Sequence, residues 1–490
     1  MKCMRPLIYL IALLLPSSFC KAQSVLDSVL DTRPHAWWGS MVVEVASGDT
    51  LFIRNATRSF VPASVTKLFT TAAVLDQLGP DYRYVTRLYA EGTQTGSVLE
   101  GNLLVRGAGD PSTGAAGDDW MNLFHAFADS LLALGIQEVR GDLIGDDNVF
   151  DDVPLGADWS WEDLVYGYAA QISGLTFYDA VVDLHAYPTK PGARGELSIT
   201  PDSGSFLMVD NQTLTLPRGQ ELVEGHTRIP ESNQIIVSSQ VPVGRSDPEA
   251  ITVHNPTLYF VHGLRTVLAS RNIHVYGQFL DVDDLSLDPD YSAARVIASH
   301  TSAPLSELVA TVNKESHNLY AEHLLKTLGR ERPEPGDFEP GSAAMGLEAG
   351  MRTYENAQIE TDRLQLVDGS GLSRKNLITP ATTIALLRYM ALHPNLGVRD
   401  AFLSSLAVGG QDGTLEYRFI RNSPGYGRVR AKTGTLGNVN SLAGYITQND
   451  GSLLAFVIFA NHFQGHHAPI REIQESFINE LIDLPLEGNN

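Results

Sequence analysis

The chain has 490 residues, which is enough for about three domains. Its 43% of apolar and 19% of charged residues are typical of a globular protein with a large core, and they exclude a disordered tail protein or a small disulfide scaffold. The net charge of −22 repels phosphate backbones and no Lys/Arg cluster counters it, so we expect no nucleic-acid partner.

The first 22 residues predict a secretory signal peptide. Lys2 and Arg5 provide a positive start, an apolar run follows over residues 7–15, and small side chains precede an expected cleavage site after Ala22. The apolar run is shorter than the roughly 20 residues that a membrane-spanning helix needs, and no later segment reaches that length. We therefore expect export across the inner membrane to the periplasm, as a soluble or loosely membrane-associated protein without a transmembrane segment.

Cleavage after Ala22 would remove both cysteines of the chain, Cys3 and Cys20. The mature protein would then have no disulfide, no thiol nucleophile and no cysteine metal site. Its net charge would change from −22 to −25, because three basic residues are lost. Lipidation of Cys20 is the alternative, but the bulky Phe19 stands where a lipoprotein cleavage site has a small residue.

Both ends of the mature chain carry strands and helices. In chain order, the patterns predict an amphipathic stretch at residues 24–31 and a hairpin of two strands at 41–45 and 50–53. A helix at 64–78 follows. Near the C-terminus they predict three strands and a final helix, at residues 428–435, 441–447, 452–461 and 469–482. Because a sheet must bury its apolar faces, we expect an α/β (α+β) fold in which one antiparallel sheet, assembled from both ends, has helices on both faces.

The middle of the chain has a different texture. Residues 80–300 hold short β-type runs with frequent glycine, proline and aspartate, interrupted by one helix at 256–270, and helical periodicity returns from Ala303. We interpret this region as two mainly β domains inserted into the helix-and-sheet domain. We expect a signal peptide at residues 1–22 and a main domain split between 23–80 and 300–490. The insert is expected to form domain II, at 81–195 and 252–299, with domain III nested inside it at 196–251.

The first candidate for chemistry is Ser64, with Lys67 three residues later at a helix start. On a helix this spacing puts both side chains on one face. The helix dipole and burial would both lower the pKa of the lysine, so that a neutral amine could act as a base beside a serine nucleophile. Taken alone, the pair also fits a helix-capping serine and a surface lysine, and the same spacing occurs by chance at Ser18 and Lys21.

The second candidate is Ser316-His317-Asn318. Ser316 offers a hydroxyl that can pass a proton, and Asn318 offers an amide that can hold a substrate peptide bond. The same S-x-N pattern at 270–272 ends the predicted helix and is interpreted as a chance match. Alone, the motif also fits ordinary polar residues that flank a helix.

The third candidate is Lys432-Thr433-Gly434-Thr435, on an edge strand ahead of the final hairpin. Gly434 lets a ligand approach the backbone closely, and Lys432 supplies a charge. The hydroxyls of Thr433 and Thr435 can bind a carboxylate, and the Thr435 and Ser64 amides could donate to an oxyanion. Alone, this short motif is also compatible with an ordinary strand.

Together and in this order, the motifs S-x-x-K, S-x-N and K-T-G are typical of β-lactamases and penicillin-binding proteins. The chain resembles the D-alanyl-D-alanine carboxypeptidase/endopeptidase family, the low-molecular-mass class C penicillin-binding proteins. Supporting segments are VRGAGDP, DWSWEDLVYGYAAQISGL and DGSGLSR, at 105–111, 158–175 and 368–374. The separation of 252 residues between Ser64 and Ser316 fits the inserted domains of this family. Two departures, Ala108 and His317, remove no reacting atom.

The resemblance implies a β-lactamase/DD-peptidase-like fold and a serine DD-peptidase that hydrolyses D-alanyl-D-alanine ends and D-alanyl–diamino-acid cross-bridges of peptidoglycan. Its implied partners are peptidoglycan stem peptides and, as covalent inhibitors, β-lactam antibiotics, and it implies no cofactor. Ser64 is then the nucleophile and Lys67 the general base. Ser316, with Lys432 nearby, relays a proton to the leaving amine. The implied substrate-binding residues are Asn318, Thr433, Gly434 and Thr435.

Two other functions stay open at this stage. A serine β-lactamase or related esterase would use the same acyl-enzyme chemistry, and rapid turnover of penicillin would favour it. A class A β-lactamase, however, carries a deacylating glutamate on a loop soon after S-x-N, whereas Glu322 lies on the predicted helix and Glu331 in a proline-rich loop. A non-catalytic wall-binding scaffold would release no D-alanine from a stem pentapeptide.

Three weaker signals complete the sequence. No metal site is predicted, because the acidic and histidine clusters lack a recognisable metal-site spacing, and we interpret their side chains as solvent-exposed. These residues are Asp281, Asp283, Asp284, Asp288, Asp290, His462, His466 and His467. Trp161, Tyr166 and Tyr168 are interpreted as core of the insert, with a glycan platform as the alternative. The segment 368–374 is either a simple tight turn or a wall of the substrate cleft.

Overall fold

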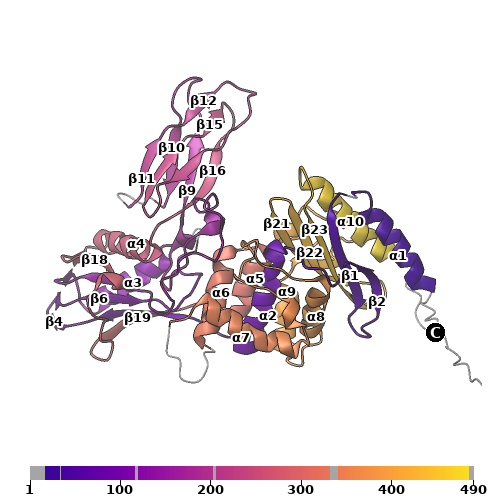
Figure 1. Cartoon of the computed structure of the whole chain (residues 1–490). Helices are drawn as coiled ribbons and strands as arrows, with labels where there is room; N and C mark the ends of the chain where they lie inside the picture. Colours follow the sequence, from indigo (N-terminus) through magenta and orange to yellow (C-terminus); the bar gives the residue numbers. More distant parts are fainter. Residues whose placement is uncertain (1–16, 34, 116–119, 202–205, 332–339, 485–490) are drawn as a thin grey trace, which may run out of the picture.

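The computed structural model describes residues 17–33, 35–115, 120–201, 206–331 and 340–484 (Figure 1). Residues 1–16 of the predicted signal peptide lie outside the described residues, and helix α1 (Ser17–Leu30) begins within its last part. Among the described segments, no helix is both long and apolar enough to cross a membrane.

One six-stranded antiparallel sheet joins the two ends of the chain. Its order is β2-β1-β23-β22-β21-β20, with the bounds Thr50–Arg54, Trp37–Glu44, Leu453–Asn461, Val439–Thr447, Val429–Leu436 and Ala407–Val408. β1 pairs with β23 along its whole length, from Trp37 opposite Asn461 to Glu44 opposite Leu454. This pairing confirms the predicted sheet assembled from both ends.

Helices cover both faces of this sheet (Figure 1). On one face α1 packs against α10 (Ala468–Asp483) over a shared apolar core. On the other face α8 (Pro380–Ala391) contacts β1 and β23, and the apolar core continues from there into a layer of further helices. These helices are α2 (Thr66–Leu78), α5 (Leu305–Lys314), α6 (Asn318–Glu331), α7 (Ala343–Asn356) and α9 (Leu396–Ser405). Because both faces are covered, β22 and β23 are buried along nearly their whole length, and the predicted fold class is confirmed.

Helix α2 runs through the centre of this helical layer. Every residue from Thr66 to Leu75 is buried, so the helix has no solvent face in its first ten positions. Its buried hydroxyls are satisfied locally or by a neighbouring loop: Thr66 Oγ1 donates to the Ala63 carbonyl at 2.9 Å, and Thr70 Oγ1 to the Gly369 carbonyl at 2.8 Å. The helix ends at Gly79, as the sequence predicts.

Residues between α2 and α5 form the parts at the left and at the top of Figure 1. A five-stranded sheet has the order β18-β8-β6-β3-β19, with the bounds Phe279–Asp281, Leu143–Asp146, Leu103–Arg106, Val85–Ala90 and Arg295–Thr301. A four-stranded sheet has the order β17-β7-β5-β4, with the bounds His274–Val275, Glu138–Val139, Val98–Glu100 and Thr93–Thr95. Helices α3 (Asn122–Ala133) and α4 (Pro256–Ser270) share an apolar core with these strands.

Three smaller sheets project at the top of Figure 1. Their orders are β10-β9-β16, β11-β14-β13 and β12-β15, with the bounds Glu196–Thr200, Val181–Tyr187, Asp247–Thr252, Met208–Asn211, Gln234–Val237, His226–Arg228, Leu214–Leu216 and Gln240–Pro242. β9 pairs with both β10 and β16, so a boundary between residues 195 and 196 would separate it from its partners. The division into domains therefore stays a prediction.

Candidate active site

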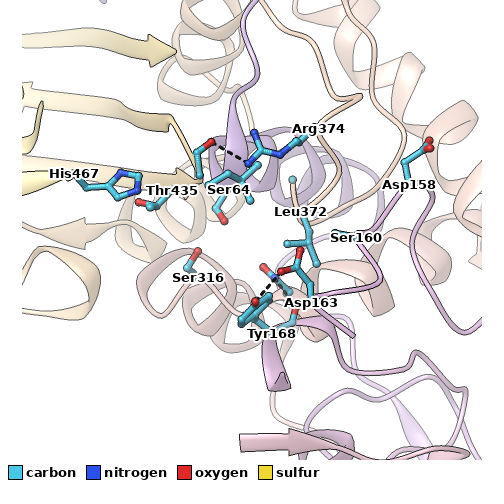
Figure 2. Close-up of a pocket in the computed structure, with 14 residues that line it drawn as sticks. Ser64, Asp158, Ser160, Asp163, Tyr168, Ser316, Leu372, Arg374, Thr435 and His467 are labelled. Atoms are coloured by element: carbon cyan, nitrogen blue, oxygen red, sulfur yellow. Dashed lines mark hydrogen bonds between the residues drawn. The ribbon is translucent and has the colours of Figure 1, made fainter. Parts of the chain in front are cut away.

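Ser64 lies in a single 3₁₀ turn, η1 (Ala63–Val65), that leads directly into α2 (Figure 2). Ala63 has φ +49, a left-handed conformation that costs a non-glycine residue about 1 kcal/mol or more. Ser64 is partly exposed, whereas both of its neighbours are buried. Lys67 Nζ lies 3.0 Å from Ser64 Oγ, so the predicted spacing does bring the two side chains together.

Lys67 is fully buried and faces three oxygen atoms. Besides Ser64 Oγ, its amine donates to Asn318 Oδ1 and to the Ser370 carbonyl, each at 2.6 Å. Burial lowers the pKa of Lys67 to about 7, while the carboxyl groups of Asp368 and Glu322 act in the opposite direction. At neutral pH a substantial fraction of the amine is therefore unprotonated and able to accept a proton.

Ser316 occupies the connection between α5 and α6 with φ +66, another left-handed non-glycine residue. Lys432 Nζ donates to Ser316 Oγ at 2.9 Å and to the Thr433 carbonyl at 2.8 Å. Burial, and then the neighbouring Lys67, hold the pKa of Lys432 well below its usual value. Each of the two serines therefore has its own buried lysine.

The third motif lies on the free edge of β21. The short strand β20 pairs only with Arg430 and Ala431, so among the described residues no strand pairs with the segment from Lys432 onward on that side. Gly434 passes so close to η1 that an added Cβ would lie 2.6 Å from the Pro62 carbonyl oxygen. Thr433 Oγ1 donates to Thr414 Oγ1 at 2.9 Å, which fixes its hydroxyl beside the edge.

A cavity of about 420 Å³ opens between these three segments (Figure 2). It is lined by Ser64, Asp158, Ser160, Asp163, Tyr168, Ser316, Asn318, Gly371, Leu372, Arg374, Thr435, Leu436, Gly437 and His467. Among the residues singled out in the sequence, Ser64, Ser316, Asn318 and Thr435 reach its surface directly. Lys67 and Lys432 lie behind the serines.

The insert contributes one wall of this cavity, which the sequence did not indicate. Asn318 Nδ2 donates to the Tyr168 carbonyl at 2.7 Å, so the insert orients an amide of the second motif. Trp161 is 80% exposed and Tyr168 is 46% exposed, so their interpretation as core residues is wrong. Tyr166, in contrast, is partly buried against the core of the insert, and its ring stacks on that of Tyr168 at 5.7 Å.

The segment 368–374 is a wall of the cleft, and two buried carboxylates hold it. Asp368 accepts hydrogen bonds from the backbone amides of Gly371 and Ser373, at 2.8 and 2.7 Å. Glu322 accepts from the amides of Gly369 and Ser370. Glu322 is therefore unlike the deacylating glutamate of a class A β-lactamase, which lies on a loop. The sequence signal for its contact with the 368–374 loop was its position on α6, four residues after Asn318.

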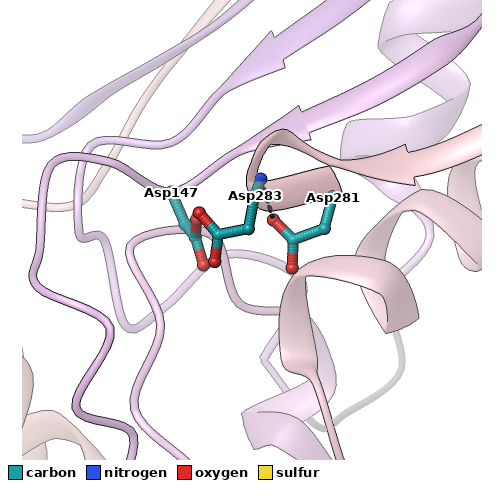
Figure 3. A group of neighbouring side chains, drawn as sticks. All are labelled: Asp147, Asp281 and Asp283. Carbon is teal, nitrogen blue, oxygen red and sulfur yellow. Dashed lines mark hydrogen bonds between the residues drawn. The ribbon is translucent and has the colours of Figure 1, made fainter. Parts of the chain in front are cut away.

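The predicted solvent exposure of the acids and histidines is only partly right. Asp281 is 5% exposed, because it caps the 3₁₀ turn η4 (Val282–Asp284) and accepts a hydrogen bond from Asn255 Nδ2 at 2.7 Å. Its carboxylate lies within 4.8 Å of those of Asp147 and Asp283 (Figure 3). His467 is also partly buried and lines the cavity, whereas His462 and His466 are exposed as expected.

Replacing Asp281 with asparagine is expected to stabilise the protein in a pH-dependent way. Burial and then Asp147 raise the pKa of Asp281 to about 7, against about 3.9 in an unfolded chain. The folded state thus holds an extra proton between these values, and its stability falls as the pH rises through this window. The variant should gain on the order of 2 kcal/mol at pH 8 and little at pH 4.5. Thermal unfolding at both pH values tests this, and an equal gain at both would contradict it.

Comparison with solved structures identifies the class of fold. Penicillin-binding protein 4 (dacB) from Haemophilus influenzae superposes with a TM-score of 0.80 at 24% identity, over 93% of this chain and 99% of that chain. A second structure of the same protein, complexed with a novel β-lactam, superposes with a TM-score of 0.76 at 22% identity, over 93% of this chain and 99% of that chain. The fold is thus that of a penicillin-binding protein.

The family follows from sequence comparison. The model of the D-Ala-D-Ala carboxypeptidase 3 (S13) family matches residues 22–479, so the chain belongs to this family. It is also 34% identical over 445 residues to the D-alanyl-D-alanine carboxypeptidase of Actinomadura sp. (strain R39), covering 88% of this chain and 78% of that protein. The resemblance seen in the sequence is confirmed.

Proposed function

We propose that the protein is a serine DD-peptidase that hydrolyses D-alanyl-D-alanine ends and D-alanyl–diamino-acid cross-bridges of peptidoglycan through an acyl-serine intermediate. The observation that carries this proposal is the convergence of Ser64 and Ser316 on one cavity, each within 3.0 Å of a fully buried lysine amine. Membership of the D-Ala-D-Ala carboxypeptidase 3 family supports the substrate class.

In the proposed acylation step, Ser64 Oγ attacks the carbonyl carbon of the penultimate D-alanine and forms a C–O bond. Lys67 accepts the hydroxyl proton, which its lowered pKa of about 7 permits at neutral pH. The backbone amides of Ser64 and Thr435 are assigned to the oxyanion that develops on the substrate carbonyl.

The second half of the reaction breaks the C–N bond. The proton that Lys67 accepted passes through the Ser316 hydroxyl, with Lys432 at 2.9 Å, to the leaving amine, and Lys67 is neutral again. Water then attacks the acyl-enzyme carbonyl, Lys67 takes up its proton and returns it to Ser64 Oγ, and the C–O bond breaks as the shortened peptide leaves.

Substrate binding is assigned to the second and third motifs. Asn318, held by the Tyr168 carbonyl, would orient the substrate amide. The hydroxyls of Thr433 and Thr435 would bind the terminal carboxylate of a carboxypeptidase substrate, and Gly434 lets β21 pass close to the turn that carries Ser64. A β-lactam carbonyl offers the same electrophile to Ser64, which accounts for β-lactam antibiotics as covalent inhibitors. The proposed site of action is the periplasm.

The decisive experiment incubates the purified mature protein with a stem pentapeptide and with cross-linked muropeptides. We expect release of D-alanine from the first and monomers from the second, and neither product with Ser64→Ala. Covalent labelling by a fluorescent penicillin should likewise disappear in this variant. Labelling that persists in Ser64→Ala would show that another residue is the nucleophile.

The same labelling experiment separates the proposal from a β-lactamase. A DD-peptidase is expected to keep the fluorescent acyl group over many minutes, because its site is not built for fast deacylation of penicillin. Loss of the label within seconds, together with absence of D-alanine release, would favour a serine β-lactamase or esterase.

A further inference from the structure

Glu322 is a buried carboxylate that the proposed reaction leaves unused. It lies on α6 one turn after Asn318 and is 1% exposed. Its oxygen atoms accept from the Gly369 amide at 3.0 and 3.1 Å and from the Ser370 amide at 2.8 Å. A carboxylate buried this completely needs such donors, and here one loop supplies them, through the two backbone amides and the Ser370 side chain.

The loop that Glu322 holds is also fixed from within. Besides the two backbone amides already described, Asp368 accepts from Asn376 Nδ2 at 2.7 Å and from Trp159 Nε1 at 3.1 Å. Its pairing with Trp159 ties the loop to the insert. Gly369 and Ser370, which Glu322 binds, are therefore the residues that connect the loop to α6.

The same two residues face α2 with their carbonyl groups. The Gly369 carbonyl accepts from Thr70 Oγ1 at 2.8 Å, and the Ser370 carbonyl accepts from Lys67 Nζ at 2.6 Å. The peptide group between Gly369 and Ser370 thus bridges Glu322 and Thr70, and the residue Ser370 links Glu322 to Lys67, through its amide on one side and its carbonyl on the other. The Ser370 carbonyl belongs to the peptide group whose Gly371 amide donates to Asp368, so the position of its oxygen relative to Lys67 depends on Asp368 as well as on Glu322.

We propose that Glu322 is a positioning residue for Lys67: it aims the Ser370 carbonyl at the amine, and its negative charge, with that of Asp368, sets how the amine exchanges protons. This inference rests on the proposed role of Lys67 as the general base. It gives a catalytic reason for a glutamate on the helix that begins with Asn318.

The charged groups around Lys67 determine the sign of the expected effect. Glu322 faces it from α6, Asp368 from the loop and Lys432 from β21. The two carboxylates raise the pKa of Lys67 against the larger effect of burial. Burial, and then Asp368, raise the pKa of Glu322 itself to about 7, so Glu322 and Lys67 titrate over the same range of pH. Glu322→Gln removes this second titrating group together with the negative charge that raises the pKa of Lys67, so the amine becomes able to accept a proton at a lower pH.

The test measures the rate of labelling by a fluorescent penicillin between pH 5 and 9 for Glu322→Gln, Glu322→Asp and the native protein. Glu322→Gln is expected to move the acid limb of the profile down by about one pH unit and to lower the plateau about tenfold. Glu322→Asp keeps the carboxylate but shortens the side chain, so the acid limb of the profile should stay in place while the rate of labelling falls. Glu348→Gln, an exposed carboxylate on α7, serves as the matched control and should behave like the native protein.

A slower Glu322→Gln with an unmoved limb would reduce Glu322 to a structural role and overturn the proposal, as would a profile identical to that of the native protein. If Glu322→Gln fails to fold, as judged by near-UV circular dichroism, Glu322→Asp decides, because a displaced limb in that charge-preserving variant contradicts the proposal. Absence of labelling in the native protein would instead refute the proposed function.

Discussion

Replacing Lys67 with methionine is expected to lower the rate of acylation of Ser64 by about 10³- to 10⁴-fold. Methionine fills a similar volume, but its thioether sulfur is far too weak a base to accept the hydroxyl proton. The nearest other lysine of the site, Lys432, is engaged with Ser316 and the Thr433 carbonyl. The variant should also lose the acid limb near pH 7 that the lowered pKa of Lys67 gives to the native protein.

Stopped-flow labelling with a fluorescent penicillin over a range of pH provides the measurement. Lys190→Met is a suitable control, because Lys190 is an exposed residue of the insert, remote from the cavity in sequence and absent from its lining. Labelling of Lys67→Met at the native rate at pH 8 would show that another group accepts the proton.

Replacing Gly371 with alanine is expected to cost about 3 kcal/mol or more of stability and to slow acylation by about 100-fold. Gly371 has φ +82, and an added Cβ would lie 2.0 Å from the Ala63 carbonyl oxygen and 2.8 Å from Thr66 Oγ1. The clash therefore falls on the turn that carries Ser64, and relieving it must move the nucleophile or the loop that binds Lys67.

Gly451 offers a matched control at the tip of the β22–β23 hairpin. Its φ of +85 is nearly the same, but an added Cβ would meet nothing within 4 Å. Gly451→Ala should therefore show the backbone penalty alone, about 1 kcal/mol, with native acylation. Equal unfolding free energies and equal labelling rates for the two variants would show that the contact with Ala63 does not matter.

Local sequence patterns correctly predicted the helices and strands whose signals lie within a few neighbouring residues. The helix at 256–270 has the bounds of α4, and the three C-terminal strands and the final helix agree with β21, β22, β23 and α10 within one or two residues. Alternation and helical periodicity record which faces are buried, and turn residues such as Gly79 mark the ends. The joining of both ends in one antiparallel sheet was also predicted, and the pairing of β1 with β23 carries it out.

The solvent exposure of side chains and their partners from distant segments were harder to predict from the sequence. Trp161 belongs to an apolar-looking segment yet is exposed, and Asp281 belongs to an acidic run yet is buried. Composition within a window reports an average polarity, whereas burial depends on which distant segment covers a residue. For Asp281 that segment begins at Asn255, whose side chain satisfies the carboxylate.

Residue identity and local spacing were enough to identify the family, the three motifs and the order in which they occur. The burial of Lys67 between Asn318 and the Ser370 carbonyl, and the nearness of the Glu322 and Asp368 carboxyl groups, followed only from the folded chain. A pKa depends on desolvation and on charges within a few ångströms, and the chain brings those charges from positions about 250 and 300 residues away.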